Sequence, residues 1–131
     1  MIHLSIANIQ NIHLNAISNG HTYLFKWFVR KNEVKTVIGL SYADTAGICG
    51  NLDILRYLHK NQSIWNTFYW SYYTDNAIKN GHLEIVKYAH ENEHIDNVSR
   101  RYFCNHAADN GHLEILKYLH EHWYPWGHRN I

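Results

Sequence analysis

The stretch Ala77-Ile-Lys-Asn-Gly81-His-Leu-Glu-Ile-Val-Lys-Tyr-Ala-His-Glu91 decides the fold, because the chain contains three more copies of it. A close copy occupies residues 107–121, a recognisable one residues 46–60, and a divergent one residues 16–30. The glycines that the copies share fall 30, 31 and 30 residues apart. A period in this range is typical of stacked repeat proteins, in which each unit folds against its neighbours.

Each unit is expected to fold as two short helices joined by a tight turn. In the fourth copy, residues 102–109 are expected to form a helix, and Asn110-Gly111 follows as a stop signal. Glycine adopts the left-handed conformation that ends a helix without a steric penalty. Residues 113–121 then carry apolar side chains at helical spacing, with Glu114 and Lys117 three apart on the exposed side. Helices this short are unstable alone in water, so stacked units must supply the core.

The repeats therefore predict an all-α fold, a short solenoid of about four helix-turn-helix repeats with abbreviated inter-repeat loops. We expect a single repeat domain over residues 1–131. Its parts are a degenerate first repeat, three further repeats and a C-terminal tail or cap, at residues 11–40, 41–71, 72–101, 102–122 and 123–131. The residues expected to hold the repeat frame are Gly20, Gly50, Gly81, Gly111, Ala46, Ala77, Ala107, Leu52, Leu83 and Leu113. The first repeat is degenerate because Thr22 and Tyr23 replace the usual leucine and acid.

Composition argues against several functional classes. The formal net charge of +1 is too balanced for a protein that binds nucleic acid by neutralising phosphates. No stretch approaches the ~20 apolar residues of a membrane span. We therefore expect no nucleic acid and no membrane among its partners. The 12 histidines would become charged as the pH falls below about 6, so we expect stability to fall on mild acidification.

One literal metal-binding motif is present, His90-Glu-Asn-Glu-His94. On a continuous helix this spacing places two imidazoles on one face to hold zinc, with Glu91 as general base. The repeat frame gives a simpler explanation, because His90 has equivalents at His59 and His120. The helix is also expected to end near Glu91. A zinc-dependent hydrolase using His90, Glu91 and His94 is therefore the minor alternative, and no cofactor, metal or catalytic residue is predicted.

The connections between units are the candidates for recognition. Residues 61–71 are crowded with aromatic side chains, and residues 92–101 are polar and end in two arginines. Tyrosine and tryptophan are enriched in binding hot spots, where they are anchored in well-packed pockets. An alternative stays open, in which the aromatic side chains fill the groove between units. The candidate partner contacts are Trp65, Tyr69, Trp70, Arg100 and Arg101.

The copies resemble ankyrin repeats. The resemblance lies in the alanine, the glycine four positions later and the His-Leu-Glu-Ile-Val/Leu-Lys-Tyr segment after it, over residues 11–121 or so. The chain looks especially like the divergent ankyrin arrays found in large DNA viruses, amoebae and oomycetes. It lacks the Thr-Pro-Leu-His opening of the family, where it reads Ser41-Tyr-Ala-Asp44, Tyr72-Tyr-Thr-Asp75 and Tyr102-Phe-Cys-Asn105. The resemblance implies a binding scaffold without catalytic residues.

The leading hypothesis is a non-enzymatic protein-protein interaction module that presents a rigid repeat surface to another protein. A preformed surface loses little conformational entropy on association. We expect a cytoplasmic location, in the host cytoplasm if the source is viral. We also expect a monomer, or weak self-association through uncapped ends. A further hypothesis is a relic fragment of a longer repeat array, stable only as a pair of chains.

Overall fold

The computed structural model describes residues 6–32, 39–61, 70–92, 95 and 100–122. Within these ranges the chain forms eight α-helices and no strand. The predicted all-α solenoid of four two-helix units is therefore confirmed. In chain order the helices are α1 (Ile6–Ser18), α2 (Thr22–Asn32), α3 (Gly39–Cys49), α4 (Leu52–Lys60), α5 (Trp70–Lys79), α6 (Leu83–Glu91), α7 (Arg100–Asp109) and α8 (Leu113–His122).

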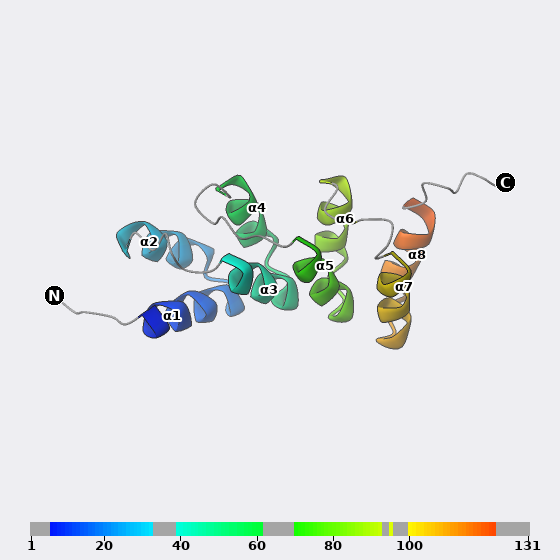
Figure 1. Cartoon of the computed structure of the whole chain (residues 1–131), viewed down its shortest axis with the longest axis horizontal. Helices are drawn as coiled ribbons and strands as arrows, with labels where there is room; N and C mark the ends of the chain where they lie inside the picture. The colour runs from blue at the N-terminus through cyan, green and yellow to red at the C-terminus, as the bar shows by residue number, and fades with distance from the viewer. Residues whose placement is uncertain (1–5, 33–38, 62–69, 93–94, 96–99, 123–131) are drawn as a thin grey trace.

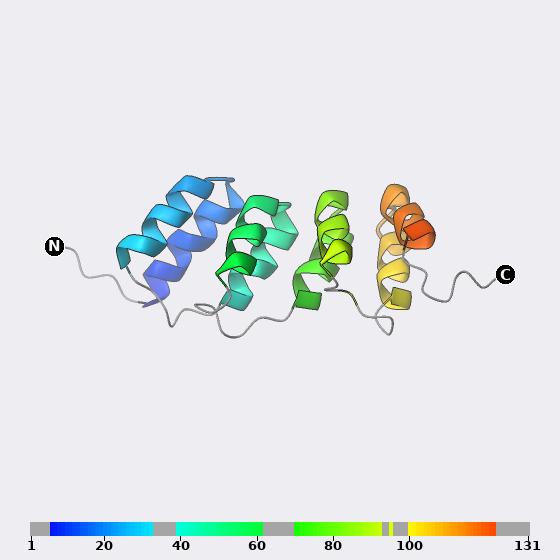
Figure 2. The same cartoon turned by 90° about the horizontal axis from the view of Figure 1, so that it is seen from above.

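The four units follow one another along a single axis (Figures 1 and 2). The first helices, α1, α3, α5 and α7, form one layer, and the second helices, α2, α4, α6 and α8, form the other (Figure 1). Helix α3 packs against both α1 and α5. It approaches α5 so closely that a Cβ atom at Gly47 would collide with the Tyr73 carbonyl oxygen. None of the eight described helices has the length and hydropathy needed to cross a membrane.

Each unit turns between its two helices through the same glycine motif. The shared glycines have φ values of 75°, 79°, 81° and 74°, all in the left-handed region. In the fourth unit the His112 N–H donates to the Ala107 carbonyl at 2.8 Å, and the Gly111 N–H donates to the Ala108 carbonyl at 3.1 Å. This pair of bonds is a Schellman motif, which satisfies carbonyls left over at a helix end. The longer-range bond, to the frame alanine or its equivalent, recurs in the other three units at 2.8–2.9 Å.

The structure corrects the unit boundaries that the sequence suggested. Helices α3, α5 and α7 each begin two residues before the expected start of their unit, and α1 begins at Ile6 instead of near residue 11. Trp70 and Arg100 therefore open helices and do not lie in connections, and Arg101 belongs to the first turn of α7. Arg101 and Tyr102 are exposed, so this turn lacks the apolar spacing that marks a packed helix. The expected short inter-repeat loops and the tail at 123–131 lie outside the described residues.

The core contains the frame residues of both layers. The frame alanines of the last three units are fully buried, and their small size lets neighbouring helices approach closely. The frame leucines differ from one another: Leu52 and Leu83 are half-buried against the core, whereas Leu113 is 58% exposed. The expectation that a packed leucine holds the frame is therefore wrong in the fourth unit. No further unit among the described residues covers Leu113.

The first unit has a polar group in its core. His13 is fully buried, and its Nδ1 is hydrogen-bonded to the Tyr42 hydroxyl. The rings of Phe25, Phe28 and Tyr42 meet the imidazole edge-on, with centroids 5.0–5.3 Å away. The Nε2 atom has no hydrogen-bond partner among the described residues. Burial lowers the pKa of the His13 imidazole to about 4, because water cannot solvate a charged ring at this position.

The glycine turns offer a matched pair of substitutions. A Cβ at Gly81 would lie 2.8 Å from the His112 ring, whereas a Cβ at Gly111 would meet nothing within 4 Å. We expect Gly111→Ala to lower the free energy of unfolding by about 1–2 kcal/mol, the cost of the left-handed conformation alone. Gly81→Ala should lower it by about 1 kcal/mol more, because the ring must also move. Urea denaturation measures both, and equal losses would show that the ring has no part in holding the turn.

Acid should destabilise the chain through His13. The unfolded state takes up a proton near the ordinary pKa of 6.5, but the folded state does so only near pH 4. The His13 contribution is therefore fully present above pH 6.5 and is lost as the pH falls toward 4, by up to about 3 kcal/mol. In melts between pH 7 and 4.5, His13→Gln should show a shallower decline than wild type. Parallel declines would assign the acid sensitivity to other histidines.

Candidate protein-binding surface

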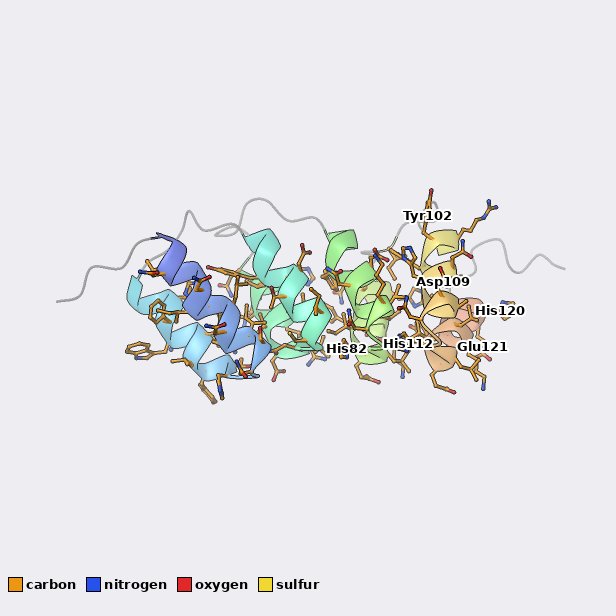
Figure 3. The ribbon with its side chains drawn as sticks, turned by 90° about the horizontal axis from the view of Figure 1, so that it is seen from below. His82, Tyr102, Asp109, His112, His120 and Glu121 are labelled. Carbon is orange, nitrogen blue, oxygen red and sulfur yellow. The ribbon has the colours of Figure 1, made fainter. Side chains whose placement is uncertain are left out.

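A histidine after the glycine fastens a unit to the one before it. The His82 Nε2–H donates to the Ile48 carbonyl at 2.8 Å, and the His112 Nε2–H donates to the Lys79 carbonyl at 2.9 Å. Figure 3 shows both histidines along the same edge of the array. Both carbonyls lie in the last turn of a helix, where intrahelical donors are missing. In the second unit the side-chain amide of Asn51 takes this role, at 3.2 Å from a carbonyl of the first unit.

A second link joins the second helices of neighbouring units. The Nδ1 atom of His59 lies 2.5 Å from the Tyr88 hydroxyl, and that of His90 lies 2.7 Å from the Tyr118 hydroxyl. The rings also meet edge-on, with centroids 5.9 and 5.6 Å apart. The first unit has Val29 at the corresponding position, so this link begins with the second unit. The histidine column that the sequence showed therefore holds the repeat frame together.

A third link is formed by a basic side chain six residues after each of the first three shared glycines. It lies over the tyrosine ring of the following unit, at a distance suited to a cation–π interaction. The pairs are Lys26 with Tyr57 at 5.1 Å, Arg56 with Tyr88 at 5.8 Å, and Lys87 with Tyr118 at 6.0 Å. The predicted neighbours Glu114 and Lys117 form an ion pair at 3.8 Å. These contacts fix the basic side chains in place along the second-helix layer.

The geometry around His90 does not favour the zinc alternative. Helix α6 ends at Glu91, and the backbone N–H of its C-cap, Asn92, bonds to the His90 and Tyr88 carbonyls. The motif therefore does not lie on one continuous helix, and His90 Nδ1 is engaged by Tyr118. His94 lies outside the described residues. Among the residues described, no group of three His, Cys, Asp or Glu side chains could hold a metal ion.

The partner contacts predicted from the sequence are only partly described. Trp65 and Tyr69 lie outside the described residues, as do the side chains of Trp70 and Arg100. Arg101 is exposed on the first turn of α7. Its neighbour Tyr102 is 65% exposed, and Figure 3 shows it at the opposite end of α7 from the turn that leads into α8. The grouping of the five predicted contacts into one site stays a prediction.

Sequence reasoning missed a cleft in the second-helix layer. It lies between α2 and α4, with a volume of about 1200 Å³. Its lining includes Tyr23, which is 89% exposed, and the basic side chains of Lys26, Arg56 and Lys60. Asp53 is the one acidic residue in the lining. Aromatic and basic side chains together suit an acidic segment that also carries apolar groups.

The substitution at Tyr23 was the sequence signal for this cleft. The other three units have an acid at this position, and each acid pairs with the base three residues later at 3.5–4.0 Å. In the first unit, Tyr23 leaves Lys26 without that acid. In the sequence alone, the change marks the first repeat as degenerate. The structure shows that it also places an exposed aromatic ring beside a group of basic side chains.

Charge differs between the two ends of the second-helix layer. Helices α2 and α4 together carry five Lys and Arg residues and one Asp. Helices α6 and α8 carry two Lys and four Glu residues. The surface around the cleft is therefore basic, and the corresponding surface of the last two units is mildly acidic.

The tyrosine links can be tested with another matched pair. Tyr88→Phe removes the hydroxyl that His59 contacts and keeps the ring under Arg56. We expect it to lower the free energy of unfolding by about 1 kcal/mol, the usual net value of one hydrogen bond. Tyr57→Phe removes the equivalent hydroxyl in a unit whose predecessor has Val29 and no histidine, and should have a smaller effect. Equal losses in urea denaturation would contradict the role given to His59.

Comparison with known proteins agrees with this geometry. The family model for ankyrin repeats (many copies) matches residues 74–120, which include the glycine turns at Gly81 and Gly111. No curated protein and no solved structure matches the chain significantly. Ankyrin repeats are generally protein-protein interaction modules and are generally not enzymes. The match identifies residues 74–120 as similar to ankyrin repeats, and the same left-handed glycine turn recurs in the first two units, outside the matched residues.

Proposed function

We propose that this protein is a non-enzymatic binding module whose partner protein inserts an acidic segment with apolar side chains into the cleft between α2 and α4. The observation that carries the proposal is the lining of that cleft. It combines the exposed Tyr23 ring with Lys26, Arg56 and Lys60, against a single carboxylate, Asp53. Basic side chains would speed and orient the encounter with an acidic partner, and the aromatic ring would supply apolar contact area.

The cleft is largely preformed, which favours binding. Lys26 and Arg56 lie over the rings of Tyr57 and Tyr88, and Arg56 also lies 4.0 Å from Asp53. A cation above a ring keeps its N–H groups free to reach a carboxylate at the side. Since these side chains are already positioned, less rotamer entropy is lost when the partner arrives.

A second candidate surface comes from the sequence. It would lie on the connection before α5 and on the first turns of α5 and α7. Its residues would be Trp65, Tyr69, Trp70, Arg100 and Arg101. Arg101 and its neighbour Tyr102 are exposed, which supports this surface. The two candidates lie on different helices, so substitutions can separate them.

Selection of a displayed random-peptide library against the full chain tests the proposal. We expect the enriched peptides to combine Asp or Glu with aliphatic or aromatic residues. Fluorescence polarisation with one enriched peptide then gives its dissociation constant. Tyr23→Ala/Lys60→Glu should weaken binding by about a hundredfold, the combined effect of losing an aromatic anchor and reversing one charge.

The control uses the equivalent positions of the last unit, Glu114→Ala/Glu121→Lys. This variant changes the same places in the repeat, far from the cleft, and should bind the peptide as wild type does. If Arg101→Glu abolishes binding while the cleft variant retains it, the partner uses the surface predicted from the sequence. Absence of acidic peptides from the selected pool would contradict the cleft proposal.

A further inference from the structure

We propose that copies of this chain associate head to tail, with the first unit of one copy stacking on the fourth unit of another. The contact would repeat the interface that already joins neighbouring units within the chain. This goes beyond the proposed partner binding in the cleft between α2 and α4, although His21 and Leu24 line that cleft as well. The argument rests on which repeat positions are buried inside the array and exposed at its two ends.

The first unit exposes the face that later units bury against their predecessor. Four residues after the shared glycine, the later units have Ile54, Ile85 and Ile115, each at most 1% exposed. The first unit has Leu24 at this position, and Leu24 is 46% exposed. Trp27 stands where the later units have the tyrosine that lies seven residues after the glycine, and it is 49% exposed. The head of the array therefore exposes apolar side chains at positions that are buried or half-buried in the later units, and Leu24 also belongs to the lining of the cleft between α2 and α4.

The fourth unit exposes the opposite face. Five residues after the glycine, Leu55 and Val86 are fully buried, whereas Leu116 is only half-buried. Two residues after the glycine, Leu113 is 58% exposed. These positions face a following unit in the interior of the array. Among the described residues, no unit follows α8.

The glycine turn of the fourth unit is also more exposed than the glycine turns of the second and third units. Cβ atoms built at Gly50 and Gly81 would lie 2.6 and 2.8 Å from the histidine ring of the next unit. A Cβ at Gly111 would meet nothing within 4 Å. The fourth unit therefore has an open glycine turn where the second and third units have one covered by an imidazole; the turn at Gly20 is open as well, because the second unit has Asn51 in place of the histidine.

The head carries the side chain that fits this uncovered turn. His21 follows Gly20 as His82 follows Gly81, and His21 is exposed. Stacking in the internal register would place the His21 ring over Gly111. Its Nε2 would then face the Asp109 carbonyl, the counterpart of the carbonyls that His82 and His112 reach. Figure 3 shows Asp109 on the last unit of the array.

Stacking in this register would also form a cation–π contact and an apolar contact between the two copies. The Trp27 ring would lie over Lys117, as the Tyr57 ring lies against Lys26 inside the chain. Leu24 would cover the exposed Leu113 and the half-buried Leu116 of α8. Helix α2 has Lys and Arg residues and no acid, whereas α8 carries two Glu and one Lys. These charges favour head-to-tail contact and oppose head-to-head contact.

A contact of this kind joins two different surfaces, so it leaves one free head and one free tail on every assembly. Assemblies should therefore grow with protein concentration instead of stopping at a dimer. A head variant and a tail variant should behave differently, because each retains one intact surface. Mixing them permits one contact only.

Sedimentation velocity of the full chain over a wide concentration range tests the proposal. We expect the wild type to form progressively larger species. Leu24→Glu, at the head, and Leu113→Glu, at the tail, should each raise the dissociation constant about tenfold or more, because each places a carboxylate in an apolar contact. A mixture of the two variants should recover wild-type affinity and stop at a 1:1 dimer.

Tyr23→Glu is the matched control. It adds the same charge beside Leu24, at an outward position where the other units already have an acid. It should associate like wild type while weakening peptide binding in the cleft, so failure of one proposal is distinguishable from failure of the other. Thermal melts followed by circular dichroism check that all three variants fold. A wild type that is monomeric at every concentration, or a mixture that stays monomeric while wild type associates, would overturn head-to-tail stacking.

Discussion

The left-handed turn at the shared glycine is the constraint on which the rest of the structure depends. It ends the first helix, returns the chain beside it, and turns the alanine carbonyl toward the N–H that follows. At Gly50 and Gly81 the missing Cβ also leaves room for the histidine ring of the next unit. At these two positions the absence of a Cβ atom therefore permits both the left-handed turn and the contact between units. The left-handed turn alone favours glycine in all four units, and the histidine ring adds a second requirement at Gly50 and Gly81.

Contacts between units are made by side chains at fixed repeat positions. A histidine caps a carbonyl of the preceding unit, a tyrosine hydroxyl meets the histidine of the preceding unit, and a base lies over that tyrosine ring. Each link reaches only the adjacent unit, so stability is close to a sum of nearest-neighbour terms. The first unit lacks the histidine of the second link, because Val29 occupies its place. Its interface relies instead on aromatic packing around His13 and Phe25.

The fold could be predicted from the sequence because one helix-turn-helix motif recurs at a constant period. The period gave four units, and the turn at Gly111 was predicted correctly from Asn-Gly alone. Helix starts were misplaced because first-turn residues such as Arg101 are exposed and carry no apolar spacing. The cleft could not be predicted, since Lys26, Arg56 and Lys60 come together only when α2 and α4 are stacked. Periodicity shows which positions face the core, but neighbouring units decide which surface residues meet.

The recurrence of the links at fixed positions has a consequence for how such a gene can change. If recombination deleted the third unit, His112 would meet the Ile48 carbonyl and cover Gly50, as His82 does now. Tyr118 would meet His59 and lie beside Arg56, as Tyr88 does now. Duplication of a unit would be accommodated in the same way. The array can therefore shorten or lengthen by whole units in one genetic step without needing a new interface.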